Sequence, residues 1–222
     1  RSLNPPIMWQ FVSAPVTTVG NRHCVTLPAK GAHQFYRLYR REVQEVDAAD
    51  NLFPPLGTYR SPDDLITPFF VVGDPDRPLL MRRFAHPNPP DTTRRPPPCV
   101  GCPPDLHEIQ TQIMFEVSTD GGETWSFYAW PCKWFVGLQS DIPPDDHYQA
   151  EIVYLEARGT TGGLRIRESP TRPSLGRTFI HPDDNGGYRV GSFFDVWVEI
   201  SMDDGQTWHP ADTDVPMDLM KP

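Results

Sequence analysis

The stretch that decides the fold is Ser192-Phe-Phe-Asp-Val-Trp-Val-Glu-Ile-Ser-Met-Asp-Asp-Gly-Gln-Thr-Trp208. A shorter version occurs earlier in the chain as Met114-Phe-Glu-Val-Ser-Thr-Asp-Gly-Gly-Glu-Thr-Trp125, and the two copies align without a gap at an offset of 83 residues. Both copies end in the pattern S-x-D-x-G-x-T-W. The chain therefore contains an internal repeat, which predicts two equivalent structural units.

Each copy has the pattern of a β-hairpin. Apolar residues alternate before the turn, with Phe115 and Val117 in the first copy and Val198 and Ile200 in the second, and a period of two is typical of a half-buried strand. In the turn, an Asp carboxylate can accept backbone hydrogen bonds and a Gly adopts a positive φ angle at little cost. We therefore predict two structural hairpins without a catalytic role. Their motif residues are Ser118, Asp120, Gly122, Thr124, Trp125, Ser201, Asp203, Gly205, Thr207 and Trp208.

The motif resembles the Asp-box, a β-hairpin signature of sialidases and many other secreted β proteins, and both copies match it over eight residues. This resemblance implies a hairpin remote from any catalytic centre, and no activity. A second resemblance covers roughly residues 148–212. It is carried by the run Arg167-Glu-Ser-Pro-Thr-Arg-Pro-Ser-Leu-Gly176 and by the second motif. This part looks like an uncharacterised β-sandwich module of secreted bacterial surface proteins, which implies architecture and location only.

Composition limits the fold and the partners. The 222 residues include 27 Pro and 16 Gly, which interrupt helical spacing and exclude long helices. The net charge of −9 argues against a nucleic-acid partner, because such binding depends on Lys and Arg neutralising phosphates. No apolar run approaches the roughly 18 residues of a membrane-spanning helix, so we expect no membrane span.

The repeat and the Pro-rich stretches predict an all-β chain of two small β-sandwich-like modules with Pro-rich loops and an extended N-terminal arm. We place the arm at residues 1–45, the first module with its Pro/Cys-rich loop and first hairpin at 46–140, and the second module with the second hairpin at 141–222. Within the arm, Val25-Thr-Leu-Pro28 and Phe35-Tyr-Arg-Leu38 resemble the closing strands of β-sandwich modules in large secreted bacterial proteins.

The four cysteines, Cys24, Cys99, Cys102 and Cys132, are disulfide candidates, because an even count in a chain of secretory character favours oxidised pairs. One option is a disulfide between Cys132 and either Cys99 or Cys102. The remaining cysteine of that pair would then bond to Cys24. The alternative is a zinc site built from Cys99, Cys102, His107 and Cys132, since Cys-x-x-Cys-x4-His begins like a zinc knuckle. Gln112 stands where such a knuckle has its last cysteine.

We expect no cofactor, with calcium or zinc as the alternatives, and no catalytic residues. The chain has no G-x-S-x-G elbow, no phosphate-binding loop and no H-E-x-x-H pair, and its Asp pairs lie in turns beside Pro, Gly or Asn. The aromatic cluster from Trp125 to Val136 is explained by burial, or by an exposed platform for sugars or a partner. The platform would consist of Tyr128, Trp130 and Trp134.

These features predict a secreted structural or assembly protein without catalytic activity, located outside the cell or on its surface. Its expected partners are other copies of itself or other surface proteins. We expect the N-terminal arm, or the Pro-rich loop between His86 and Pro104, to pack on a neighbouring copy, since unpaired strand edges recruit partners. The alternatives are a carbohydrate-binding accessory module that recognises glycans and, further off, a metal-binding or hydrolytic protein.

Overall fold

The computed structural model describes residues 43–69, 78–89, 93–100, 102–140, 147–159 and 163–220, and the backbone of two short strands, β1 (Val16–Val19) and β2 (Arg22–Val25). The chain divides into two compact units, residues 1–42 and residues 43–222. In the first unit, β1 and β2 pair in antiparallel orientation. The other predictions for residues 1–42, including the side chain of Cys24, lie outside the described residues.

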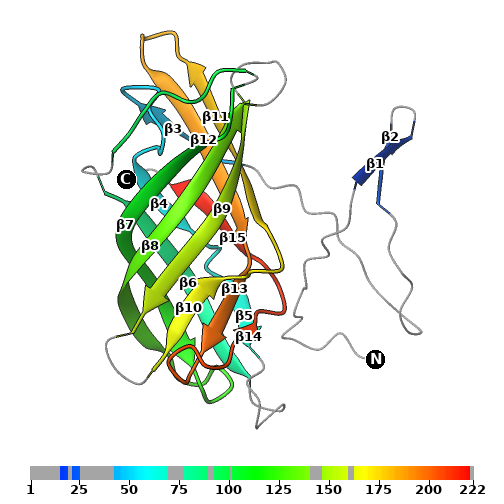
Figure 1. The fold of residues 1–222 in the computed structure, drawn as a ribbon, viewed down its shortest axis with the longest axis vertical. Coiled ribbons are helices and arrows are strands. Elements are labelled where there is room, and N and C mark those ends of the chain that lie inside the picture. Colours follow the sequence, from blue (N-terminus) through cyan, green and yellow to red (C-terminus); the bar gives the residue numbers. More distant parts are fainter. Residues whose placement is uncertain are drawn as a thin grey trace. The chain divides into compact units, whose positions relative to one another are not determined.

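The described part of the second unit consists of strands and loops without a helix, as predicted for an all-β chain. Its strands are antiparallel and belong to one sheet (Figure 1). They are β3 (Glu45–Ala48), β4 (Gly57–Arg60), β5 (Ile66–Phe69), β6 (Leu79–Asn88), β7 (Asp105–Ser118), β8 (Ser126–Ser140), β9 (His147–Arg158), β10 (Arg165–Glu168), β11 (Ser174–Pro182), β12 (Tyr188–Val196), β13 (Val198–Ser201), β14 (His209–Pro210) and β15 (Val215–Met220).

The sheet closes into an eight-stranded barrel in the order β4-β6-β7-β8-β9-β11-β12-β15, because β15 pairs with β4 and β11 pairs with β9. The shorter β5, β10, β13 and β14 extend it at the lower end in Figure 1. β4 continues into β5, β10 into β11, β12 into β13 and β14 into β15, so each segment of the barrel lies beside the next one along the chain. The barrel is thus of the up-and-down kind.

The structure does not show two separate sandwich modules. β8 from the first predicted module pairs with β9 from the second, and β4 pairs with β15. The physical reason is that four strands leave two edges with unpaired backbone groups, and each half pairs its edges with those of the other half. The repeat thus marks two halves of one barrel, which share one core.

Strand alternation decides which aromatic residues enter that core. On β8, Trp130, Cys132 and Trp134 are buried while the residues between them are exposed. Trp130 and Trp134 are only 5% and 3% exposed, whereas Tyr128 is 37% exposed and stacks on Phe115. The predicted exposed platform of Tyr128, Trp130 and Trp134 is therefore wrong, because the period of two turns both tryptophans inward.

The barrel interior is almost filled by side chains. Its cavity measures about 30 Å³ and has an apolar wall that includes Tyr59, His86, Trp134 and Phe194. A space of this size holds no more than a water or two. Burial lowers the pKa of His86 to about 3, and neither ring nitrogen has a hydrogen-bond partner among the described residues. A larger ligand must therefore bind outside the barrel.

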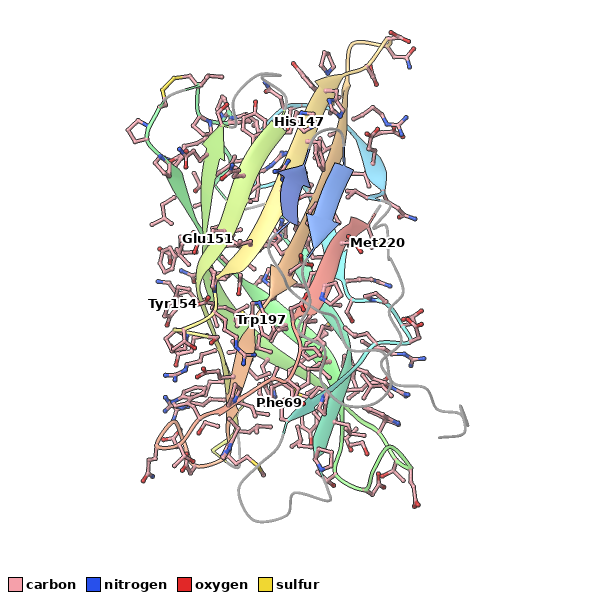
Figure 2. All side chains as sticks on the ribbon, turned by 90° about the vertical axis from the view of Figure 1, so that its right-hand side faces the viewer. Phe69, His147, Glu151, Tyr154, Trp197 and Met220 are labelled. Carbon is pink, nitrogen blue, oxygen red and sulfur yellow. A yellow bond between two sulfur atoms is a disulfide. The ribbon has the colours of Figure 1, made fainter. Side chains whose placement is uncertain are left out.

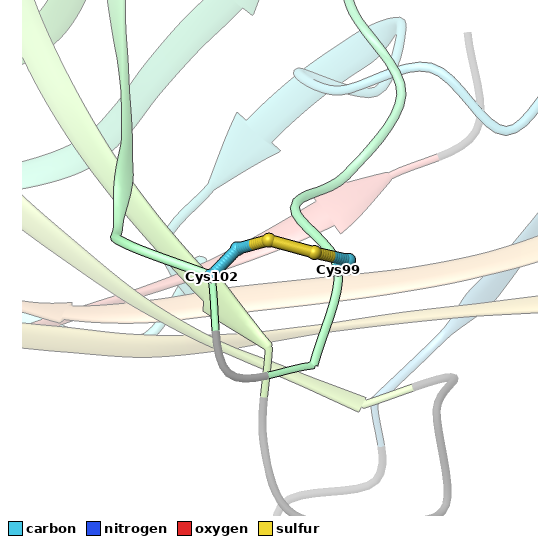
Figure 3. Close-up of a disulfide and its surroundings, with 2 residues drawn as sticks. All are labelled: Cys99 and Cys102. Atoms are coloured by element: carbon cyan, nitrogen blue, oxygen red, sulfur yellow. A yellow bond between two sulfur atoms is a disulfide. The ribbon is translucent and has the colours of Figure 1, made fainter.

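The cysteines are arranged differently from the expected pairing. Cys99 and Cys102 form a disulfide with each other in the loop before β7, with their Cα atoms 5.3 Å apart (Figure 3). Cys132 is a free thiol inside the barrel, and burial raises its pKa to about 12. Its inward position on β8 separates it from the disulfide loop, so the pairing of Cys99 or Cys102 with Cys132 is wrong.

Candidate binding groove

Both repeated motifs form hairpin turns between antiparallel strands, β7 with β8 and β13 with β14. In the first, the Ser118 hydroxyl donates to the Asp120 carboxylate at 2.6 Å, and the Gly122 N–H donates to the Ser118 hydroxyl at 2.8 Å. The Trp125 indole N–H donates to the Gly122 carbonyl at 3.0 Å and closes the turn. These bonds hold the turn together, which is a structural role.

The second hairpin repeats the same bonds with matching distances. Ser201 donates to Asp203 at 2.8 Å, and the Gly205 N–H donates to Ser201 at 2.8 Å. The Thr207 hydroxyl donates to Asp203 at 2.6 Å, and Trp208 donates to the Gly205 carbonyl at 3.0 Å. Hydrogen bonds from Thr207 and Ser201 lower the pKa of the Asp203 carboxyl to about 2. The two turns are thus equivalent, as the sequence repeat predicts.

Each hairpin tryptophan also contacts an arginine from the neighbouring strand that pairs with the motif strand, β6 beside β7 and β10 beside β13, and this arginine forms an ion pair with the glutamate opposite it on the motif strand. The two sets are Arg82, Glu116 and Trp125, and Arg167, Glu199 and Trp208. The guanidinium lies 3.9 Å from the Trp125 ring centroid in the first set and 4.0 Å from that of Trp208 in the second. The closest nitrogen–oxygen distance of the ion pair is 2.7 Å in both. The repeat therefore includes residues outside the recognisable motif.

A groove lies next to the second set, Arg167, Glu199 and Trp208, where the pairing of β9 with its neighbouring strands is interrupted. Ile152 of β9 pairs with Ser174 of β11, and Glu156 pairs with Arg167 of β10. Three residues of β9 thus face a longer segment that contains Ser169-Pro-Thr-Arg-Pro173. Proline has no N–H for a sheet bond, and the extra length leaves the sheet as a loop. The gap between β9 and this loop is the groove.

The loop is held in place by residues on its inner side. The Ser169 N–H donates to the Trp197 carbonyl at 2.8 Å, and the Trp197 N–H donates to the Ser174 hydroxyl at 2.9 Å. The Arg172 guanidinium lies 4.5 Å from the Trp197 ring centroid. Figure 2 shows Glu151, Tyr154 and Trp197 at the middle height of the barrel, between His147 and Phe69. The groove wall is therefore fixed by backbone and side-chain contacts.

The groove has a volume of about 640 Å³, and its wall mixes charged, apolar and aromatic groups. This volume is within the range of ligand pockets, roughly 300–1,000 Å³. The lining residues are Glu151, Val153, Tyr154, Leu155, Glu156, Arg167, Glu168, Ser169, Pro170, Thr171, Arg172, Pro173 and Trp208. The groove is thus large enough for a few side chains of a partner or for a short oligosaccharide.

Most charged groups of the groove are engaged. Arg167 pairs with Glu199, which also accepts a hydrogen bond from Ser169 at 3.1 Å. Glu156 accepts a hydrogen bond from the Tyr154 hydroxyl, and this bond is the main reason that the pKa of Tyr154 is raised to about 12. The Arg172 guanidinium donates to a backbone carbonyl at 3.3 Å.

Two carboxylates of the groove, Glu151 and Glu168, have no cationic partner among the described residues. The Ser174 hydroxyl donates to Glu168 over a long 3.4 Å. Burial, reinforced by the charges of Glu151 and Glu199, raises the pKa of Glu168 to about 7. The negative charges of Glu151 and Glu168 repel each other. A cation between the two carboxylates would offset this repulsion, because an opposite charge nearby favours the ionised form of a carboxyl group. The groove is therefore suited to a positively charged group.

The other predicted site residues do not assemble into a metal centre. Cys99 and Cys102 are consumed by their disulfide, and Cys132 is inside the barrel. His107 is buried against Phe53, with ring centroids 4.9 Å apart, and its Nε2 lies 3.3 Å from a carboxylate oxygen of Asp105. Within the described ranges, no group of three or more His, Cys, Asp or Glu is placed to hold a metal ion.

Sequence reasoning missed Glu151 and Glu168. The available signal was the spacing of two prolines, Pro170 and Pro173, inside a segment between two strands, which indicates a loop that leaves the sheet. Which strand would face that loop depends on barrel closure, and the sequence pattern does not specify closure. Comparison of the chain with protein-family models, with curated proteins and with solved structures finds no match in any of the three. The chemistry of the groove must therefore indicate what it binds.

Proposed function

We propose that this chain is an extracellular, non-catalytic assembly protein whose groove binds a cationic segment of a protein partner. The observation that carries the proposal is the pair Glu151 and Glu168, two carboxylates that no cationic side chain of the described residues neutralises, in a groove of about 640 Å³. Opposite charges guide a partner to such a site and fix its orientation. The apolar parts of the wall, such as Val153 and Pro170, provide area that a partner can cover.

The filled barrel supports a binding role rather than the transport of a ligand inside it. The interior cavity of about 30 Å³ is too small for anything larger than water. An extracellular location is supported by the Cys99–Cys102 disulfide, since such bonds persist mainly in oxidising compartments. No helix in the described parts of the chain is long and apolar enough to cross a membrane.

The test uses a short synthetic peptide of alternating arginine and phenylalanine, with citrulline in place of arginine as a neutral control. Calorimetric titration above pH 8, where Glu168 is ionised, should show binding of the cationic peptide and not of the citrulline peptide. The double variant Glu151→Gln/Glu168→Gln should bind at least about ten-fold more weakly. The variant Glu123→Gln/Asp184→Asn removes two exposed charges outside the groove and should bind like the native chain. Equal binding by all three proteins would contradict the proposal.

A second candidate function is carbohydrate binding at the same groove. The observation that favours it is Tyr154, which is 38% exposed at the groove and lies among acceptors and donors such as Glu151 and Arg172. Sugar rings stack on aromatic faces while their hydroxyls bond polar side chains. A glycan array with the native chain and Tyr154→Ala tests this: a signal lost in the variant would support glycans as ligands. Hydrolysis of an array glycan that is abolished in Glu168→Gln would contradict a non-catalytic role.

A further inference from the structure

We infer that the groove is occupied by the segment from Phe35 to Arg41 of a second copy of this chain, so that copies join head to tail. This inference rests on the proposed function, because it names the partner of the same groove. It depends on three features: the unequal distribution of charge along the chain, the pattern of the segment, and the apolar surface beside the groove.

Charge is divided unequally between the two units of the chain. Residues 1–42 contain six Lys or Arg and a single acidic residue, Glu42, whereas residues 43–222 contain 14 Lys or Arg against 28 Asp or Glu. The first unit is thus cationic and the barrel unit is strongly anionic. Complementary charges of this kind accelerate association and discriminate against other partners. The most cationic stretch of residues 1–42 is Arg37-Leu-Tyr-Arg-Arg41.

The segment has the chemical groups that the groove lacks. In Phe35-Tyr-Arg-Leu-Tyr-Arg-Arg41, the residues Phe35, Arg37 and Tyr39 alternate with the others. In an extended chain, alternate residues face the same side, so the sequence pattern predicts one cation between two aromatic rings. A guanidinium can pair with two carboxylates through its five N–H donors. Arg37 therefore matches Glu151 and Glu168, the two groove carboxylates without a cationic partner in the part of the chain that the structure describes.

The surface beside the groove offers apolar contacts on both sides of these carboxylates. Val153, Tyr154 and Leu175 are 47%, 38% and 54% exposed. Leu175 lies directly opposite Glu151 in the β11–β9 pairing, and Phe135 packs edge-on against Tyr154 with centroids 5.6 Å apart. Aromatic residues together with arginine are the side chains most enriched at the centres of protein interfaces. Phe35 and Tyr39 would cover this apolar surface while Arg37 enters the groove.

Such a contact joins two different surfaces, a segment on one copy and a groove on the next. A contact between unlike surfaces produces rings or filaments, whereas a contact between identical surfaces stops at a dimer. The inference therefore predicts open-ended or ring assembly that requires both surfaces. Each copy contributes one segment and one groove, so removing either surface from every copy prevents assembly.

The test is a complementation experiment with the full chain, measured by sedimentation velocity above pH 8 and at low salt. The groove variant is Glu151→Lys/Glu168→Gln, and the segment variant is Arg37→Glu/Arg40→Glu. The native chain should form concentration-dependent oligomers that dissociate in high salt, because salt at about 1 M screens charges beyond about 3 Å. Each variant alone should self-associate at least about ten-fold more weakly. A mixture should form one-to-one dimers, because the intact segment of one variant fits the intact groove of the other.

Recovery of dimers in the mixture also shows that both variants are folded. The variant Glu123→Lys/Asp184→Lys, with two exposed acidic residues reversed away from the groove, should assemble like the native chain. A native chain that stays monomeric at all concentrations, or a mixture without dimers, would overturn the inference. The alternating arginine–phenylalanine peptide separates the two proposals: if it binds the groove of the segment variant while the mixture stays monomeric, the proposed function stands and the second copy is excluded.

Discussion

Acid should destabilise this barrel through His86, and the effect can be isolated with a single substitution. His86 is 4% exposed, it lines the interior cavity, and both its ring nitrogens lack a hydrogen-bond partner among the described residues. Burial lowers its pKa from 6.5 to about 3. Below pH 6.5 the unfolded chain therefore binds a proton that the folded barrel does not bind. The stability that depends on neutral His86 is complete above pH 6.5 and is lost as the pH falls toward 3.

The size of this effect follows from proton linkage. Each pH unit between the two pKa values lowers the free energy of unfolding by at most about 1.4 kcal/mol. From pH 6.5 to pH 5 the loss is about 2 kcal/mol, which for a domain of this size is a fall in Tm of roughly 4–8 °C. In His86→Leu this contribution is absent. Between pH 6.5 and pH 5, the free energy of unfolding of the native chain should therefore fall by about 2 kcal/mol more than that of His86→Leu.

The assay is urea denaturation followed by tryptophan fluorescence, repeated at several pH values between 5 and 8 for the native chain and His86→Leu. Met217→Leu is the matched control, because Met217 lines the same cavity and does not titrate. The control should shift stability by the same amount at every pH, since only its packing changes. Other groups, such as Glu168 with its raised pKa, titrate in all three proteins and cancel in the comparison. Parallel pH profiles for His86→Leu and the native chain would refute the reasoning.

Three further predictions concern the repeated units and the buried thiol of Cys132. Glu199→Gln should lower the free energy of unfolding more than Glu116→Gln does in urea denaturation, because the Glu199 side chain is 10% exposed and that of Glu116 is 19% exposed; the loss for Glu116→Gln should be less than about 1 kcal/mol. Asp120→Ala and Asp203→Ala should each lower the urea midpoint, and the double variant should show the sum, because the two motif strands, β7 and β13, are four segments apart in the barrel. In a Cys24→Ser background, Cys132 should react with a thiol reagent only after unfolding, since burial keeps the thiol protonated and inaccessible; rapid labelling of this folded variant would contradict the position of Cys132 inside the barrel.

Local features of the structure could be predicted from the sequence. The alternation around Phe115 and Ile200 predicts the strands, and the Ser, Asp and Gly of each motif predict the turns, because the necessary bonds form within a few residues. The 27 prolines and 16 glycines similarly exclude long helices. These predictions depend only on near neighbours in the chain.

Closure of the barrel could not be predicted in this way. It depends on the pairing of β4 with β15, which joins Tyr59 to Leu219 across most of the chain, and a strand pattern does not reveal which edges meet. Burial and an exposed platform both stayed open for the aromatic cluster for a related reason, because alternation shows which residues share a face but not which face is inside; burial holds for Trp130 and Trp134. The wrong disulfide for Cys132 has the same origin, because its inward position depends on which face of β8 is inside. The carboxylates Glu151 and Glu168 were missed because their proximity depends on which strand edges meet.

The two equivalent hairpins also bear on the origin of the fold. Their strands β7 and β13 are four segments apart in a barrel of eight, which is half a revolution about the barrel axis. Duplication and fusion of a gene for four strands would produce this symmetry, with each half closing the other. A modern half that includes Trp125 or Trp208 would then be expected to complete a barrel with a separately supplied complementary half, so that this fold can be divided into two chains and reconstituted.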